Sequence, residues 1–120
     1  MTPKITDIWF RSKLPLTEIA RRLGLRDVTD DAENYWEWVS GTLGDTRLDI
    51  TRTHTQPAER VDTRIFPPGA DSFPAALLAE LVERLQVFVS GPVVGGRWTH
   101  RAGNEFDVVV VREFDSKAVQ

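Results

Sequence analysis

The segment at residues 73–90 constrains the fold of this chain more than any other. Its apolar residues recur at helical spacing, and its polar residues gather on the opposite side. The apolar set comprises Leu78, Leu81, Val82, Leu85, Phe88 and Val89, and the polar set comprises Glu80, Glu83, Arg84 and Gln86. Ser72 is placed to cap the free amides, Pro74 falls in the first turn, and Gly91-Pro92 ends the run. Because the apolar face is wider than a single stripe, we expect a long helix that lies across a sheet and closes the core.

The rest of the chain predicts one short helix and a mainly antiparallel sheet. The short helix spans Leu16–Leu23 and ends at Gly24, and its apolar side consists of Leu16, Ile19, Ala20 and Leu23. Alternating or β-branched patterns predict strands at residues 4–11, 35–40, 46–53, 61–66, 96–100 and 106–114. The polar residues 26–34 predict a loop, and the valines at 108–111 are typical of a central strand covered on more than one side. All 120 residues are thus expected to form one α+β domain, with a long and a short helix packed on the sheet.

Composition excludes several classes of protein. The chain has no cysteine, which rules out disulfides, thiolate catalysis and zinc–thiolate sites. Its apolar runs are far shorter than the ~20 residues of a membrane-spanning helix, and its first residues show no signal-peptide pattern. The formal net charge of −3 disfavours a dedicated nucleic-acid binder, which normally carries a basic stripe. We therefore expect a cytoplasmic protein that binds neither a membrane nor nucleic acid.

No motif predicts catalysis, a metal site or a cofactor. His54 has no second ligand at i+2 or i+4, and His100 lies beside two arginines, a poor setting for a cation. The acidic residues at 27–33 lack the spacing of a calcium loop, and the glycine-rich residues 91–97 lack the ending of a P-loop. No serine or threonine occupies a nucleophile elbow. The sequence predicts a protein that is not an enzyme.

One segment, which we call the acidic window (residues 27–45), stands out by its charge. It contains no lysine or arginine, but it holds the carboxylates Asp27, Asp30, Asp31, Glu33, Glu37 and Asp45 and the aromatic residues Tyr35, Trp36 and Trp38. In a strand, Trp36 and Trp38 lie on one face, and Tyr35 and Glu37 lie on the other with Val39. Either the tryptophans fill the core and Tyr35 and Glu37 are exposed, or the tryptophans face outward.

Two interpretations of this window stay open. In the first, the aromatic residues belong to the core and the carboxylates to a solvated loop. In the second, the window is a recognition patch in which aromatic anchors provide contact area and the negative field attracts a basic protein partner. The predicted partner-binding residues are Asp30, Asp31, Glu33, Tyr35, Glu37 and Trp38.

Several short segments together resemble the immunity proteins of bacterial polymorphic-toxin and contact-dependent inhibition systems. They are Ile8-Trp9-Phe10, Leu16-Thr17-Glu18-Ile19-Ala20 with Leu23, Tyr35-Trp36-Glu37-Trp38, residues 77–85 and Asn104-Glu105-Phe106. The resemblance implies a non-enzymatic protein that binds one cognate toxin domain in the cytosol and neutralises it. It assigns no residue to the contact, so the acidic window is a candidate chosen from charge and aromatic content alone.

Two other functions are compatible with the sequence. A small-molecule-binding or enzymatic α+β domain would place its pocket between the sheet and the long helix, with Trp98, His100 and Arg101 at the mouth. A homodimer would pair through an exposed edge strand.

Overall fold

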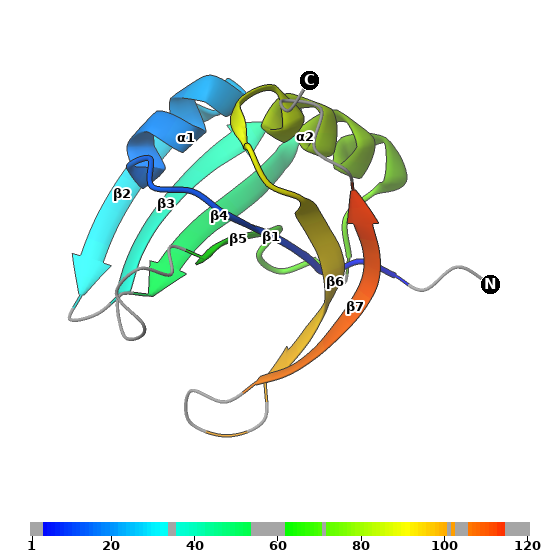
Figure 1. The fold of residues 1–120 in the computed structure, drawn as a ribbon. Helices are drawn as coiled ribbons and strands as arrows, with labels where there is room; N and C mark the ends of the chain where they lie inside the picture. Colours follow the sequence, from blue (N-terminus) through cyan, green and yellow to red (C-terminus); the bar gives the residue numbers. More distant parts are fainter. Residues whose placement is uncertain are drawn as a thin grey trace.

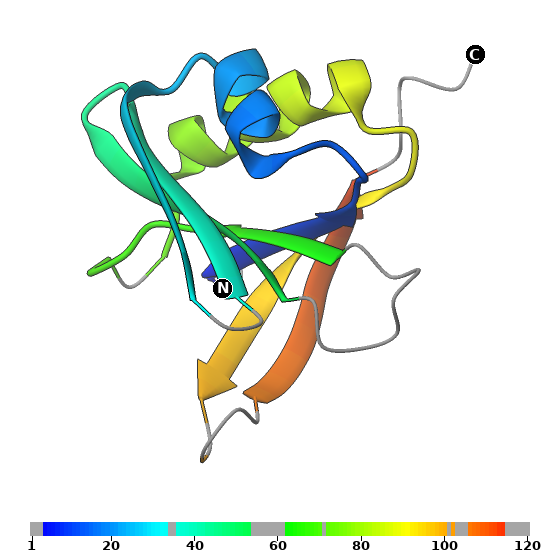
Figure 2. The same ribbon diagram turned by 90° about the vertical axis from the view of Figure 1, so that its left-hand side faces the viewer.

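The described part of the chain forms a seven-stranded antiparallel sheet with two helices on one face (Figures 1 and 2). The computed structural model describes residues 4–33, 36–53, 62–70, 72–100, 102 and 106–114. The strands are β1 (Asp7–Arg11), β2 (Arg26–Glu33), β3 (Trp36–Leu43), β4 (Thr46–Thr53), β5 (Asp62–Phe66), β6 (Val93–His100) and β7 (Phe106–Phe114). The helices are α1 (Leu16–Leu23) and α2 (Ala75–Phe88). The predicted α+β fold, with one long and one short helix, is confirmed.

The strand order is β2-β3-β4-β5-β1-β6-β7, and every neighbouring pair is antiparallel. The first strand of the chain therefore lies between β5 and β6, where it joins the β2–β5 side of the sheet to the hairpin β6–β7. The sheet ends at β2 on one side and at β7 on the other. These two edges lie far apart in the fold (Figure 1).

The core lies between the helices and the sheet face that they cover. Strand alternation directs Ile8 and Phe10 of β1 to this face, and both side chains are buried. Other fully buried side chains come from every layer: Ile19 and Leu23 in α1, Leu48 and Ile50 in β4, Ile65 in β5, and Leu81 and Leu85 in α2. The short helix has the predicted bounds and apolar side, and Gly24 after it adopts a left-handed conformation with φ of 75°.

The long helix differs from its prediction at both ends and on one face. It begins at Ala75 after Pro74, and Ser72 does not cap it, because no side chain caps this end. The residue before Pro74 is biased towards extended backbone, and the Phe73 N–H donates to the Ile5 carbonyl at 2.9 Å. Gln86 is buried although it was predicted on the polar side, because it lies one turn after Val82 on the buried face.

Three predictions about the strands were wrong. Residues 26–33 form β2, although their polar composition predicted a loop. The strand predicted at residues 96–100 was too short, because β6 already begins at Val93. Finally, β7 has the predicted bounds but lies at the edge of the sheet, and Val108, Val109 and Val110 are between 46% and 60% exposed. An uninterrupted valine run reports high strand propensity, which does not depend on whether the strand is central or at an edge.

Candidate partner-binding site

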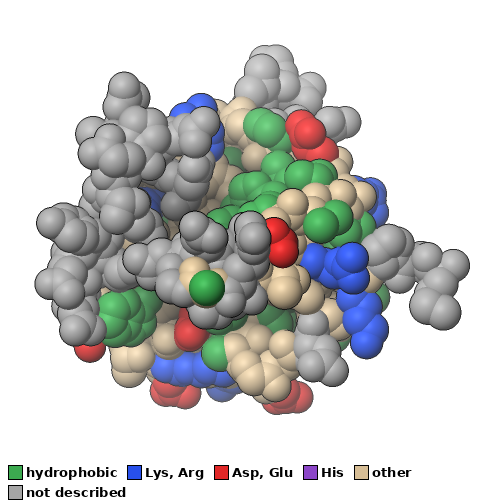
Figure 3. Space-filling view, turned by 90° about the horizontal axis from the view of Figure 1, so that it is seen from below, with side chains coloured by type: hydrophobic (Ala, Val, Ile, Leu, Met, Phe, Trp, Pro, Cys, Tyr) green, Lys and Arg blue, Asp and Glu red, His purple; other side chains and the backbone are tan. Residues whose placement is uncertain are grey.

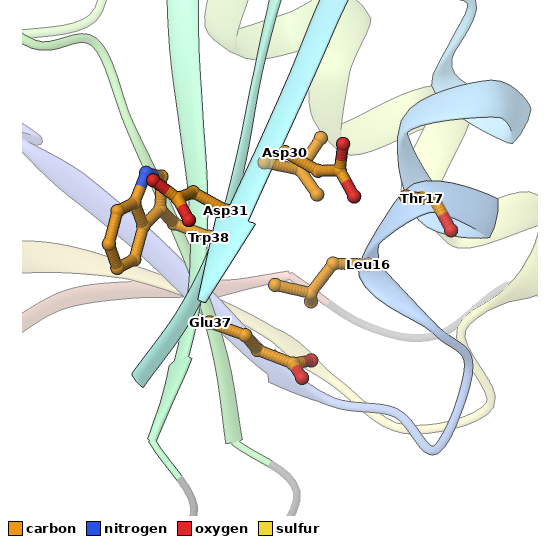
Figure 4. Close-up of a pocket in the computed structure, with 7 residues that line it drawn as sticks. Leu16, Thr17, Asp30, Asp31, Glu37 and Trp38 are labelled. Carbon is orange, nitrogen blue, oxygen red and sulfur yellow. The ribbon is translucent and has the colours of Figure 1, made fainter. Parts of the chain in front are cut away.

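A surface groove of about 380 Å³ lies between the start of α1 and the edge of the sheet at β2 (Figure 4). Its lining residues come from α1, β2 and β3: Leu16, Thr17, Asp30, Asp31, Glu37, Trp38 and Val39. Four of these were predicted as partner-binding residues, namely Asp30, Asp31, Glu37 and Trp38. We call this feature the acidic groove, because its lining carries three carboxylates and no lysine or arginine.

The β2–β3 register explains how residues from one sequence window meet in the groove. Asp30 pairs with Val39, and Asp31 pairs with Trp38 on the opposite face. In Figure 4 the Asp30 and Glu37 side chains project towards Leu16 and Thr17 of α1, whereas Asp31 and Trp38 lie together on the other side of the sheet. The groove therefore follows a sheet edge that presents carboxylates on both faces.

The structure separates the faces of β3 as strand alternation requires. Val39 is buried on the helix-covered face, in register with Ile50, and Glu37 shares this face. Trp38 lies on the opposite face, in register with Thr51, and its side chain is partly exposed. Trp38 is thus not a core residue of the helix-covered face. Tyr35 lies outside the described residues, as do the side chains of Glu33 and Trp36.

Glu37 is held in place by a buried cation. Arg52 on β4, directly opposite Glu37 in the ladder, is only 6% exposed, and its Nη1 lies 3.6 Å from Glu37 Oε1. Arg52 also donates from Nε and Nη2 to the Thr63 hydroxyl at 3.2 and 2.9 Å. Burial lowers the pKa of the Arg52 guanidinium, and the nearby Glu37 charge partly counters that shift. The ion pair with Arg52 restrains the Glu37 side chain. This side chain remains 31% exposed, so it can still face the groove.

Arg47 anchors β2 at the end of the strand away from the acidic groove. Its Nη1 donates to the Asp27 carbonyl at 2.8 Å, and its Nη2 donates to the Thr29 hydroxyl at 3.3 Å. Arg26 makes a second tie across the hairpin, from Nη2 to the Gly44 carbonyl at 2.6 Å. Arg26 and Arg47, which flank the acidic window in the sequence, therefore both hold β2 in place. This role was not predicted from the sequence, because it depends on the pairing of β2 with β3 and of β3 with β4.

On the sheet face away from the helices, one arginine lies among aromatic side chains. Hydrophobic side chains are visible on this face in Figure 3. Trp9 and Trp98 meet edge to face with ring centroids 5.7 Å apart. The Arg64 guanidinium lies 4.3 Å from the ring centre of Phe66 and 4.7 Å from that of Trp98, and its Nε donates to Asp7 Oδ2 at 2.6 Å. This cluster was not predicted from the sequence, although strand alternation places Asp7 and Trp9 on one face.

Trp98, which was expected at the mouth of a small-molecule pocket, does not lie between the sheet and α2. Trp98 contacts Trp9 on the face away from the helices, whereas Leu81 and Leu85 of α2 are fully buried in the core. His54, Arg101 and the side chain of His100 lie outside the described residues. Within the described ranges, no group of three or more His, Asp or Glu side chains is placed to hold a metal ion. The carboxylates of the acidic groove form a spread field of negative charge and not a compact set of ligands.

Comparison with models of protein families, with curated proteins and with solved structures gives no significant match to this chain. None of the helices in the described part of the chain is both long and apolar enough to cross a membrane.

Proposed function

We propose that this protein is a non-enzymatic immunity protein that binds and neutralises a cognate toxin domain in the cytosol. One observation carries the proposal: the acidic groove brings together three carboxylates and a partly exposed tryptophan from a window without lysine or arginine. A negative field speeds the approach of a basic partner, and a partly exposed aromatic ring can anchor it at low entropic cost. A toxin whose active cleft holds phosphate groups would offer such a basic surface.

The geometry suits a preformed docking site. Asp30 and Glu37 project from neighbouring paired strands, so their positions are set by the backbone ladder and not by a mobile loop. Leu16 forms an apolar floor that is 3% exposed, and it belongs to the core as well as to the groove. A site that needs little ordering on binding loses less conformational entropy.

The test first asks whether the reading frame directly upstream of this gene ends in a toxin domain, and then uses that domain as the binding partner. The two proteins are titrated at several salt concentrations, and toxicity is scored in cells that co-express them. Replacing both Asp30→Lys and Asp31→Lys is expected to slow association by about tenfold or more at low salt and to flatten its salt dependence. The matched control is Glu83→Lys, which reverses an exposed charge on α2, away from the acidic groove.

Three results would count against the proposal in different ways. Absence of binding and of protection by the native chain would remove the toxin-inhibitor function. Protection with unchanged kinetics in the double variant would retain the function but move the contact away from the acidic groove. Equal slowing by Glu83→Lys would show that net charge, and not this groove, governs association.

A further inference from the structure

Strand β7 exposes apolar residues along an edge of the sheet. It is last in the strand order, and within the described ranges no strand pairs with its outer side. Val108, Val109 and Val110 are 46%, 49% and 60% exposed. Proteins commonly protect such edges with inward charges, proline or short length, because unpaired backbone groups can bind another strand. Here the middle of a nine-residue strand carries none of these features.

A β-bulge determines which side chains of β7 share a face. Gly95 pairs with Arg112 and the next residue, Gly96, pairs with Val110, so Val111 is left out of the ladder with β6. As a result, Asp107, Val109 and Arg112 lie on one face of the sheet, in register with Thr99, Arg97 and Gly95. Val108 and Val110 lie on the other face, in register with Trp98 and Gly96.

We propose that two copies of this chain form a dimer by antiparallel pairing of their β7 strands about a two-fold axis at Val109. In the proposed ladder between the two β7 strands, Val109 lies opposite Val109 of the second copy. Val111 is left out of this ladder, as it is left out of the ladder with β6. Val108 then lies opposite Val110, and Asp107 lies opposite Arg112, each pair occurring twice. Every pair joins side chains of the same face, as a two-fold axis normal to the sheet requires.

Self-complementarity favours a second copy over an unrelated partner. The proposed register places valine against valine in the centre and opposite charges at both ends, and all of these groups are supplied by one strand. An axis one residue later, at Val110, would place Arg112 opposite Val109 and would lose the Asp107–Arg112 pairs. The strand therefore carries both the apolar contact and the charges that fix its register.

The dimer would join two sheets into one continuous sheet and leave an acidic groove at each distant end, because β2 and β7 are opposite edges. A short ladder of this kind buries less than the roughly 1,200 Å² of a stable interface, so it should form a dimer that exchanges rapidly. This inference does not depend on the proposed toxin partner.

The first test is sedimentation of the native chain between about 1 μM and about 1 mM. The expected result is a concentration-dependent shift from monomer to dimer, and a monomer throughout this range overturns the proposal. Val109→Lys places two like charges opposite each other at the axis, so it should weaken the dimer by about tenfold or more. Val87→Lys is the matched control, since Val87 is 78% exposed on α2 and should leave dimerisation unchanged.

A charge exchange tests the register. Asp107→Arg alone and Arg112→Asp alone each place like charges opposite each other twice, and each should weaken the dimer by about tenfold. The double variant carrying both changes restores opposite charges and should dimerise as the native chain does. Circular dichroism of each variant confirms that the fold is retained. If the double variant is as weak as the single ones, the proposed register is wrong.

A disulfide gives a second, independent readout. The native chain has no cysteine, so any disulfide in Val109→Cys must join two copies at that position. Directly opposed residues in an antiparallel pair have Cα atoms about 4.5–5.5 Å apart, within the range that a disulfide can span. Val109→Cys should therefore form a covalent dimer much faster than Val87→Cys under the same mild oxidation. Equal rates for the two variants would overturn pairing at Val109.

Discussion

Strands β2 and β7 are the two edges of the sheet, and they differ in the side chains that they expose. Strand β2 is rich in charged residues, and Asp30 and Asp31 are exposed at the acidic groove. Strand β7 presents three half-exposed valines in succession. Within the described residues each strand has one neighbouring strand. Carboxylates on β2 would repel a second copy, whereas the valines on β7 would attract one.

This difference has a consequence for assembly. If both edges were apolar, copies could add at either end of the sheet and grow into an open chain of sheets. With a charged edge at β2 and an apolar edge at β7, pairing through β7 occupies the apolar edge of each copy, so assembly stops at two. The charge of β2 would then serve two roles, since it blocks sheet extension and also forms the acidic groove proposed to bind a basic partner.

The largest effect on stability is expected from a change at Gly96, where β6 and β7 approach each other closely. A Cβ at Gly96 would overlap the Val109 backbone carbonyl and lie 2.7 Å from the Trp9 ring, so Gly96→Ala must open the β6–β7 ladder. We expect a loss of about 3 kcal/mol in the free energy of unfolding, measured by chemical denaturation.

The matched change at the other edge is Gly41→Ala. A Cβ there would lie 2.7 Å from Leu25 Cβ and 3.3 Å from Val28 Cγ2, which are side-chain atoms, whereas the Cβ at Gly96 meets backbone atoms of Val109. Because side chains adjust more readily than a paired backbone, the expected loss is smaller, about 1–2 kcal/mol. An equal or larger loss for Gly41→Ala would show that β2 is attached as rigidly as β7.

The next effect compares a buried cation below the acidic groove with an exposed cation on β7. Arg52→Met removes the buried cation below Glu37 and the two hydrogen bonds to Thr63, so we expect a loss of about 1–3 kcal/mol in the free energy of unfolding. Arg112→Met on β7 removes an exposed guanidinium that stacks on Phe114, and thermal and chemical unfolding of the monomer should change by less than about 0.5 kcal/mol. Similar losses for the two variants would contradict the view that the charge at Arg52 supports the fold more than the charge at Arg112 does.

The same two edges show how much could be predicted from the sequence. Helix α1, strand β4 and strand β7 have the predicted bounds, because each carries a strong local pattern that its tertiary contacts reinforce. Strand β2 was missed because an edge strand needs only one ladder partner and can remain polar. The position of β7 was wrong because the valine run does not encode which strands lie next to it. Local patterns thus predicted most elements, but not the strand order.

The acidic groove was predicted in part for a related reason. Asp30, Asp31, Glu37 and Trp38 are close in sequence, and a hairpin brings them together whatever the rest of the fold does. Leu16 and Thr17 were not predicted in the groove, because their approach depends on how α1 packs across the sheet. Arg52 was missed for the same reason, since its pairing with Glu37 depends on the β3–β4 register and its burial on packing beneath the helices.

The clearest test of the comparison, which should change stability only slightly, is to remove the charge from β2. Asp30→Val with Asp31→Val gives this edge an apolar character like that of β7, and both residues are exposed, so the fold should be retained within about 1 kcal/mol. If charge is what blocks this edge, light scattering at high concentration should reveal species larger than the dimer, which grow with time.

Glu83→Val on the outer side of α2 removes a charge of the same sign and should not cause growth. Adding Val109→Lys to the double variant should reduce the growth, because an open chain needs both edges. Growth that is insensitive to Val109→Lys would show that β2 alone suffices, and that the two edges do not act together.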